Sequence, residues 1–319
     1  MEYRKTMKKI VFFLFFINVT AVFSQTEMQI SQYMFQHTMI NPAAVGEGEM
    51  IQITGLHRLQ SVGIRNGGNT TLFSVNTPLN LPGKSPHAVG LKFKNDEAGL
   101  YYFQNAHLQY AYKKKILKGT LSAGIDFGFV NVGFRGDSVN LSEVNLGDYH
   151  TAGDRLIPSS NVNGMNFDLN VGLWYSSPKF YAGASYMNAT QPKLYWSDDR
   201  EYKLLSTFYF TGGYNYQLTN PKLMLKPSVL LKTDFSSMQV DLSANLEYDN
   251  MYWGGLTYRL QNAVVVLLGI RIPMGLNVGY AFDIPISRLG GWGSHELCLT
   301  YEIDIAFGNK NKHKSIRIL

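Results

Sequence analysis

From about residue 50 onward, hydrophobic and polar residues alternate along the chain. In ELCLTYEIDIAF, residues 296–307, every second residue from Leu297 to Phe307 is apolar. The same alternation occurs in NFDLNVGLWY, residues 166–175, and in VDLSANLEY, residues 240–248. Because successive side chains of a strand point to opposite faces, this pattern predicts strands with one apolar face and one polar face.

The length of these segments distinguishes a membrane barrel from a soluble β-sandwich. A sandwich also alternates, but its strands average about 5 to 6 residues and its apolar face is a dry core. Many segments here reach about 9 to 11 residues, which is enough to cross a bilayer at a tilt. Aromatic residues gather near segment ends, as at residues 101–103, and such residues favour the membrane interface. The sequence therefore predicts an all-β protein, a transmembrane antiparallel β-barrel.

The polar faces carry charged and amide side chains, which would be costly in a dry core but are suited to a water-filled lumen. These residues are Asp126, Asp168, Asn170, Asp241, Glu247, Asn277 and Asp283. We therefore expect the polar faces to enclose water.

About fourteen strands are predicted, an even number, as in bacterial single-chain barrels. They cover residues 49–57, 69–78, 86–94, 99–112, 117–130, 163–176, 178–187, 204–217, 222–232, 238–248, 250–259, 263–271, 274–283 and 295–307. The three longest connections, 131–162, 188–203 and 284–294, all follow odd-numbered strands. Since barrels of this class have short periplasmic turns and long outer loops, these connections are expected outside the cell. The connection 131–162 is the best candidate for a partner contact, with an ordinary outer loop as the alternative.

The N-terminus has the features of a secretory signal peptide, with basic residues before an apolar run from Ile10 to Val22. A transmembrane helix would need about 20 apolar residues, and this run is shorter. The predicted organisation is a signal peptide at 1–24, a periplasmic or plug segment at 25–48, a barrel at 49–307 and a basic tail at 308–319. Pro42 lacks a backbone donor, so residues 41–46 suit a plug or turn better than a central strand.

Composition agrees with this organisation and excludes several functions. The chain has 20 Tyr, 19 Phe and 30 Gly, and aromatic residues favour strands. Its net charge of +6 falls by three, to +3, without residues 1–24, which hold four basic residues and one acidic residue, so nothing favours nucleic acid as a partner. The single cysteine, Cys298, cannot form a disulfide within the chain and is expected as a buried thiol.

The one stretch that suggests catalysis is GSHE, with Ser294, His295 and Glu296 in succession. Consecutive strand residues point to opposite faces, so Ser294 and His295 are badly placed as a nucleophile and base. The histidines lack metal-ligand spacing and the glycines lack the setting of a phosphate loop. We predict no enzyme, metal or cofactor.

Several motifs are similar to those of one family. The stretch SQYMF at 31–35, followed by INPAAVG at 40–46, resembles the N-terminal signature of the PorP/SprF family of type IX secretion outer-membrane proteins from Bacteroidetes. Further matches include TTLFSVNTPL at 70–79, FYAGASYMNATQP at 180–192 and GSHELCLTYEI at 293–303. The chain departs from the family pattern around Ser61 and residues 66–69. Six motif positions have no role assigned by the resemblance: Asn41, Pro42, Gly46, Ser294, His295 and Glu296.

The resemblance implies an outer-membrane barrel that supports export or surface attachment of cargo such as adhesins, sometimes in gliding motility. Its implied partners are type IX secretion components, cargo with type IX C-terminal domains, and outer-membrane lipid. The first alternative is a diffusion pore or small-molecule transporter, which a polar lumen would also permit. A second alternative is a lipid hydrolase embedded in the barrel, which would depend on His295.

Overall fold

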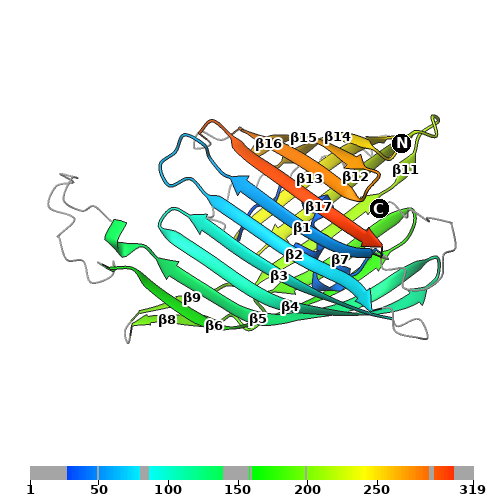
Figure 1. The fold of residues 1–319 in the computed structure, drawn as a ribbon. Coiled ribbons are helices and arrows are strands. Elements are labelled where there is room, and N and C mark those ends of the chain that lie inside the picture. The colour runs from blue at the N-terminus through cyan, green and yellow to red at the C-terminus, as the bar shows by residue number, and fades with distance from the viewer. Residues whose placement is uncertain are drawn as a thin grey trace, which may run out of the picture.

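The computed structural model describes residues 27–48, 50–79, 86–138, 158, 160–197, 200–286 and 291–304. The predicted signal peptide and C-terminal tail lie outside these residues. The chain forms a barrel of long, oblique strands (Figure 1). The strands are β1 (Met50–Leu59), β2 (Asn69–Leu79), β3 (His87–Ala98), β4 (Tyr101–Ile116), β5 (Gly119–Phe134), β6 (Val162–Ser176), β7 (Phe180–Met187), β8 (Lys193–Ser197), β9 (Arg200–Lys203), β10 (Thr207–Tyr214), β11 (Tyr216–Gln217), β12 (Leu223–Thr233), β13 (Met238–Tyr248), β14 (Tyr252–Arg259), β15 (Ala263–Ile272), β16 (Leu276–Pro285) and β17 (Ser294–Asp304).

The barrel is closed by fourteen antiparallel wall strands. Consecutive wall strands pair along the chain, β10 joins β7 to β12, and β17 pairs with β1 over residues 50–59. The short β11 continues β10 after Asn215 and also pairs with β12. Closure leaves no unpaired strand edge facing lipid. The predicted fold is therefore confirmed, including the number of wall strands.

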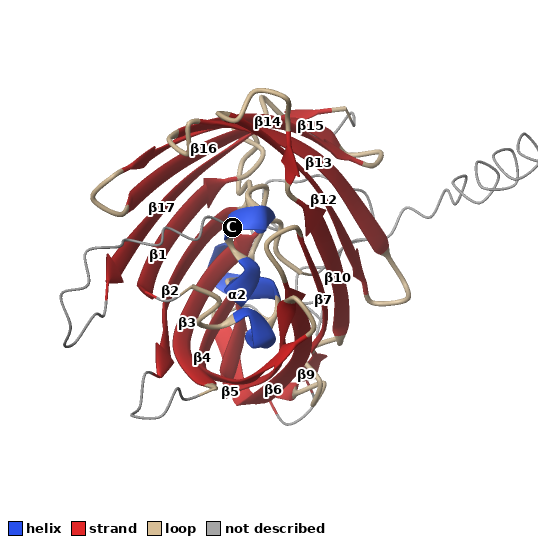
Figure 2. Ribbon diagram, turned by 90° about the vertical axis from the view of Figure 1, so that its right-hand side faces the viewer, coloured by secondary structure: helices blue, strands red, loops and turns tan. Residues whose placement is uncertain are grey.

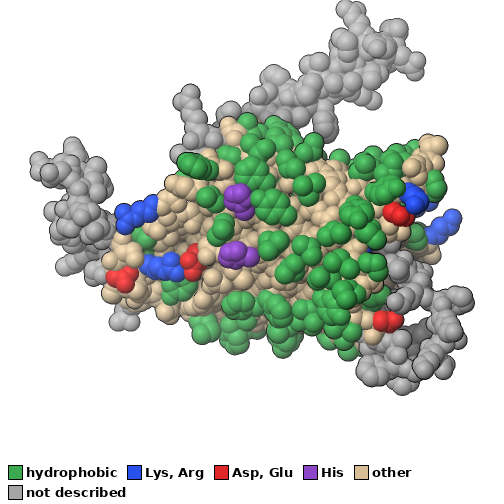
Figure 3. Space-filling view, turned by 45° about the horizontal axis from the view of Figure 1, so that its top comes forward, with side chains coloured by type: hydrophobic (Ala, Val, Ile, Leu, Met, Phe, Trp, Pro, Cys, Tyr) green, Lys and Arg blue, Asp and Glu red, His purple; other side chains and the backbone are tan. Residues whose placement is uncertain are grey.

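The two faces of the wall differ as the alternation predicts. On β17, for example, Leu297, Leu299 and Tyr301 are exposed on the outer face, whereas Glu296 and Cys298 are buried on the inner face. Apolar side chains cover much of the outer surface of the barrel (Figure 3). The outer face is thus suited to acyl chains.

The lumen differs from the sequence-based expectation of a water-filled interior. Asp126, Asp168 and Asp241 have 0% of their surface exposed. Figure 2, a view from the end of the barrel where the C-terminus is marked, shows short helices inside the wall. They belong to residues 27–48 and are η1 (Tyr33–Phe35), α2 (His37–Ile40) and η2 (Pro42–Ala44). The inward charges are therefore balanced mainly by other protein groups.

The two ends of the barrel have different connections. At one end, called here the tight-turn end, β4 joins β5 through residues 117–118 and β13 joins β14 through residues 249–251. The opposite end, called the long-loop end, holds the connections 135–161 and 188–206. Since short turns face the periplasm in barrels of this class, we expect the tight-turn end on the periplasmic side.

Two predicted connections contain structure that the sequence pattern did not reveal. Strand β5 continues to Phe134 and is followed by η3 (Gly136–Ser138), so the predicted loop 131–162 begins later than expected. Residues 139–157 of that loop lie outside the described residues. The predicted connection 188–203 contains the hairpin β8–β9.

The β8–β9 hairpin packs against the lumenal face of the wall near the long-loop end. Leu194 is fully buried in a cluster with Val130 and Val132 of β5. The indole nitrogen of Trp196 donates a hydrogen bond of 2.9 Å to the carbonyl oxygen of Val132. The hairpin thus narrows the outer part of the lumen.

Candidate functional site: a segment held inside the barrel

Residues 27–48 run through the lumen from one end to the other. Gly46 lies near the tight-turn end, where its backbone nitrogen donates to Asn76 Oδ1 at 2.9 Å. Tyr33 lies midway, with its hydroxyl 3.1 Å from the hydroxyls of Ser228 and Ser243. Glu27 lies toward the long-loop end. We call residues 27–48 the lumenal segment.

The first anchor of the lumenal segment is a carboxylate on β17. Glu296 is fully buried and accepts hydrogen bonds of 2.8 Å from the backbone nitrogens of both Ser31 and Gln32. The hydroxyl of Ser31 donates to Asp283 of β16 at 2.7 Å and accepts from Arg58 of β1 at 2.9 Å. These contacts join one short stretch of the segment to three wall strands.

The same carboxylates belong to a buried ionic network. Arg58 lies 2.7 Å from Asp283 and 3.3 Å from Glu296. Arg259 of β14 lies 2.8 Å from Asp283 and 3.1 Å from Asp241 of β13. Two arginines thus face three carboxylates, and the backbone donors of the lumenal segment help to balance the remaining negative charge. An unpaired buried charge would be costly, so the network and the segment stabilise one another.

A second anchor lies at Glu27, the first described residue. Its carboxylate forms a 2.7 Å ion pair with Lys94 of β3. Lys232 of β12 donates hydrogen bonds of 3.1 Å to the carbonyl oxygens of Glu27 and Met28. Burial alone would raise the pKa of the Glu27 carboxyl, but the attraction of Lys94, Lys232 and Lys92 outweighs burial and lowers that pKa. Glu27 is therefore held as a carboxylate.

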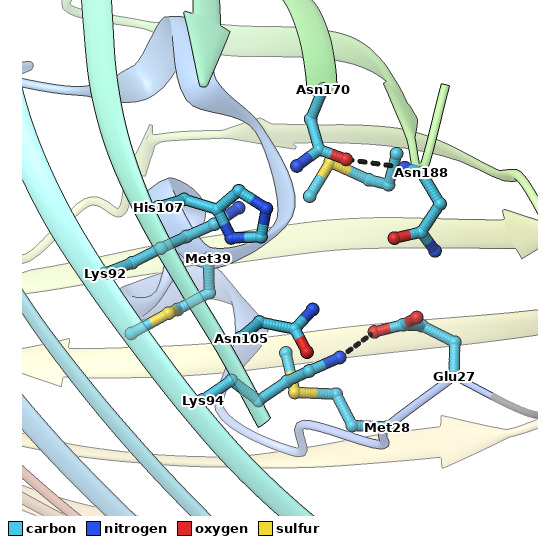
Figure 4. Close-up of a pocket in the computed structure, with 10 residues that line it drawn as sticks. Glu27, Met28, Met39, Lys92, Lys94, Asn105, His107, Asn170 and Asn188 are labelled. Atoms are coloured by element: carbon cyan, nitrogen blue, oxygen red, sulfur yellow. Dashed lines mark hydrogen bonds and ion pairs between the residues drawn. The ribbon is translucent and has the colours of Figure 1, made fainter. Parts of the chain in front are cut away.

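A small cavity of about 30 Å³ adjoins this second anchor (Figure 4). Lys94 and Glu27 meet at its edge, while Asn105 and His107 extend into it from β4 (Figure 4). A volume of this size admits about two water molecules. It is too small for a drug-sized ligand, which needs a pocket of roughly 300 Å³ or more.

The INPAAVG motif forms the part of the segment nearest the tight-turn end. The side-chain oxygen of Asn41 accepts a 2.9 Å hydrogen bond from Ala43, and its amide nitrogen donates to the carbonyl oxygens of Leu173 and Ala184. Pro42 begins η2, where its missing N–H costs nothing. A Cβ on the wall residue Gly124 would overlap the backbone of Ala43. Close approach of segment and wall therefore depends on this glycine.

Gly46 and Glu47 complete the contact at this end. Gly46 has a φ of +63°, and a Cβ there would lie 2.6 Å from the Cβ of Ala88. Both the backbone conformation and the space favour glycine. Glu47 accepts a 2.9 Å hydrogen bond from the indole nitrogen of Trp174, and the Trp174 ring lies 4.5 Å from that of His37. The segment is thus fixed to the wall at both ends.

The three residues of the GSHE stretch are divided between the two faces of β17. Ser294 is buried on the lumenal side and accepts a 3.1 Å hydrogen bond from the backbone of Ser61. His295 is on the outer face, where its Nδ1 lies 2.6 Å from the hydroxyl of Tyr280. Glu296 binds the lumenal segment. Ser294 and His295 therefore do not face one another as a nucleophile and base.

Four of the six motif positions lie at separate contacts between the lumenal segment and the wall: Asn41, Pro42, Gly46 and Glu296. Ser294 and His295 do not join them. Sequence reasoning missed Ser31, Arg58 and Arg259 as partners of Glu296 and Asp283. The available signal was that both arginines occupy inward positions of otherwise alternating strands.

No helix among the described residues has the length and apolar character to span a membrane. In the same part of the chain, no group of three or more His, Cys, Asp or Glu side chains is arranged to hold a metal ion.

A closed antiparallel barrel with an apolar outer face is a membrane-spanning architecture, the type found in outer-membrane proteins. The model of the family described as "Type IX secretion system membrane protein PorP/SprF" matches residues 22–301, and the chain belongs to this family. The resemblance in the motifs is thereby confirmed, as is the outer-membrane location. The protein has an outer-membrane role in type IX secretion and is associated with components of that system.

Solved structures show a general likeness only. Omp33 of Acinetobacter baumannii shares 6% identity, with a TM-score of 0.48, over 80% of this chain and 98% of that chain. The toluene transporter TbuX of Ralstonia pickettii shares 12% identity, with a TM-score of 0.47, over 83% of this chain and 92% of that chain. A FadL homologue of Pseudomonas aeruginosa shares 11% identity, with a TM-score of 0.44, over 82% and 92% of the two chains. A comparison with curated proteins finds no match.

Proposed function

We propose that this barrel is a docking component of the type IX secretion system. Its long-loop end holds exported proteins that carry the type IX C-terminal domain, such as adhesins. Its tight-turn end meets periplasmic components of the system. Membership of the PorP/SprF family supports the assignment to this system.

The observation that carries the docking role is the occupied lumen. The lumenal segment is anchored by Glu296 and Lys94 toward one end and by Asn76 toward the other. A barrel filled in this way offers its two rims to partners. The sequence had left residues 25–48 as either a periplasmic contact or a plug. Because residues 27–48 lie inside the wall, we assign the periplasmic contact to the tight turns.

Deleting the gene and measuring the proteins left on the cell surface tests this proposal. We expect a specific loss of proteins with type IX C-terminal domains, restored by the intact gene, while other outer-membrane barrels stay at normal levels. Loss of gliding in a gliding host would extend the role to motility. An unchanged set of surface proteins would reject the docking role.

The alternative of a diffusion pore makes a different prediction. Purified barrels in planar bilayers would conduct steadily, and deletion would leave surface adhesins unchanged. The docking role instead predicts a closed barrel, because the lumenal segment would have to move before solutes could pass.

A further inference from the structure

A row of polar side chains crosses the outer face of the barrel from β1 to β5. Each member lies directly opposite the next on the neighbouring strand. The row consists of His57, Thr71, Asn95, Gln104 and Asn131. Its members are hydrogen-bonded: His57 Nδ1 lies 3.1 Å from the Thr71 hydroxyl, Gln104 donates to Asn95 at 3.0 Å, and Asn131 donates to Gln104 at 3.1 Å. We call these five residues the polar row.

The neighbouring rows show that the polar row marks a change on the lipid-facing surface. On β2, β3 and β5, the residue two positions from the polar row toward the tight-turn end is a phenylalanine. Phe73, Phe93 and Phe129 are 42%, 40% and 56% exposed, as expected for side chains among acyl chains. On β3, Glu97 lies two positions from Asn95 toward the long-loop end, and it forms a 2.8 Å ion pair with Arg135. The surface thus changes from aromatic to amide to charged residues over about 13 Å of strand.

The polar row is inclined to the membrane plane. Cross-strand rows run perpendicular to the strands, and the strands of this wall run obliquely along the barrel (Figure 1). The row therefore descends from Asn131 on β5 toward the tight-turn end at His57 on β1. Four strand spacings of about 4.8 Å, at a tilt of about 40°, give a descent of about 12 Å. Polar groups consequently extend from the charged rim into the apolar band.

A second imidazole lies beside the lower end of the row. His295 is opposite Leu59 and His57 is opposite Leu297, so the two histidines are diagonal neighbours on β17 and β1. Figure 3 shows two histidine side chains among the hydrophobic side chains of this face. Diagonal neighbours lie about 7 to 8 Å apart, which is within reach of one ligand.

Hydroxyl groups of the wall orient both rings. The Tyr280 hydroxyl lies 2.6 Å from Nδ1 of His295. When that hydroxyl donates, the proton of the neutral ring is on Nε2, which becomes a donor toward the lipid. Thr71 holds Nδ1 of His57 in the same way. Ionisable groups on a lipid-facing surface are costly and rare, so a pair of them indicates a binding site.

We propose that the polar row and His295 bind the phosphorylated saccharide headgroup of an outer-leaflet glycolipid. The imidazoles donate to phosphate oxygens, and the amides bind sugar hydroxyls. Lipid is favoured over a protein partner because phenylalanines exposed like acyl-chain contacts, Phe73, Phe93 and Phe129, line one side of the row. A glycolipid is favoured over a phospholipid because the row spans five strands, which is more than one phosphate ester can use.

The test compares lipid retention by full-length barrels in phosphatidylcholine vesicles that contain either lipid A or phosphatidylglycerol. After extraction into detergent, mass spectrometry counts the lipid bound per barrel. For H57L/H295L we expect about hundredfold weaker retention of lipid A, because each of the two lost hydrogen bonds to a charged group is worth about tenfold or more. Q104L, which interrupts the row, should also weaken retention. H87L is the matched control, because His87 pairs with the Tyr110 hydroxyl at 2.6 Å at the tight-turn end of β3, and it should retain lipid A normally.

Heat-dependent mobility in gels checks that every variant folds. Equal retention of lipid A by H57L/H295L and the unchanged barrel would overturn the proposal, as would the same loss in H87L. An equal loss of phosphatidylglycerol would show that the row does not select a glycolipid. If the row instead crosslinks to a second barrel without lipid A, and the variants abolish that contact, the occupant is protein and the proposal fails.

Discussion

Replacing Arg58 by methionine should destabilise the anchor that holds residues 31 and 32 of the lumenal segment against the wall. The guanidinium is 1% exposed and contacts Ser31, Asp283 and Glu296. Without it, Asp283 keeps its 2.8 Å pair with Arg259. Glu296 keeps the two backbone donors of the segment but loses the one cation within 4 Å that the described residues provide. The network then has one arginine for three carboxylates.

Breaking a buried ion pair by removing one partner costs about 3 to 5 kcal/mol. We expect R58M to lower the free energy of unfolding by about 3 kcal/mol, the lower of these values, because Asp283 remains paired with Arg259. R135M is the matched control: its guanidinium is 41% exposed beside Glu97, and an exposed pair contributes about 0.2 to 1 kcal/mol. In R58M/E296Q the second substitution removes one of the excess negative charges, so part of the lost stability should be recovered.

The assay is urea unfolding of the barrel in lipid vesicles, combined with single-channel recording. R58M should lower the free energy of unfolding well beyond R135M and should add channel openings as the segment leaves the lumen. If R58M and R135M have the same stability and both remain closed, the buried network does not hold the segment, and our view of the lumen is wrong.

Two further predictions concern other contacts of the lumenal segment. G124A should cost about 1 to 3 kcal/mol of stability, because the added Cβ overlaps the backbone of Ala43, whereas G55A, with open space around its Cβ, should be nearly neutral in the same urea assay. The lowered pKa of Glu27 means that its ion pair with Lys94 contributes fully above the usual carboxyl value of 4.5 and is lost as the pH falls through the lower folded value. Proteolysis of the segment should therefore increase in acid, and E27Q should show that exposure already at neutral pH; an acid response unchanged in E27Q would show that other groups cause it.

The alternation of apolar and polar residues in the sequence determined which segments form the wall of the barrel and which side chains face outward. The spacing of Leu297, Leu299 and Tyr301 places them on one face of a strand whatever the strand pairs with. Segment length and an even count then indicated a closed membrane barrel. Each of the fourteen wall strands falls on a predicted segment, although β3, β4 and β5 each extend four residues beyond their predicted ends. These features are local, so the sequence was sufficient for them.

Only the tertiary structure decided what the polar faces meet. Alternation puts Asp241 and Asp283 on the inner face but cannot show whether that face contacts water, a cation or another segment. Ser31 contacts Asp283, 252 residues away in the sequence, and pairing of β1 with β17 brings Arg58 to Glu296. Because barrel closure creates these contacts and local periodicity does not encode which distant residues meet, the ionic network and the filled lumen were visible only in the folded chain.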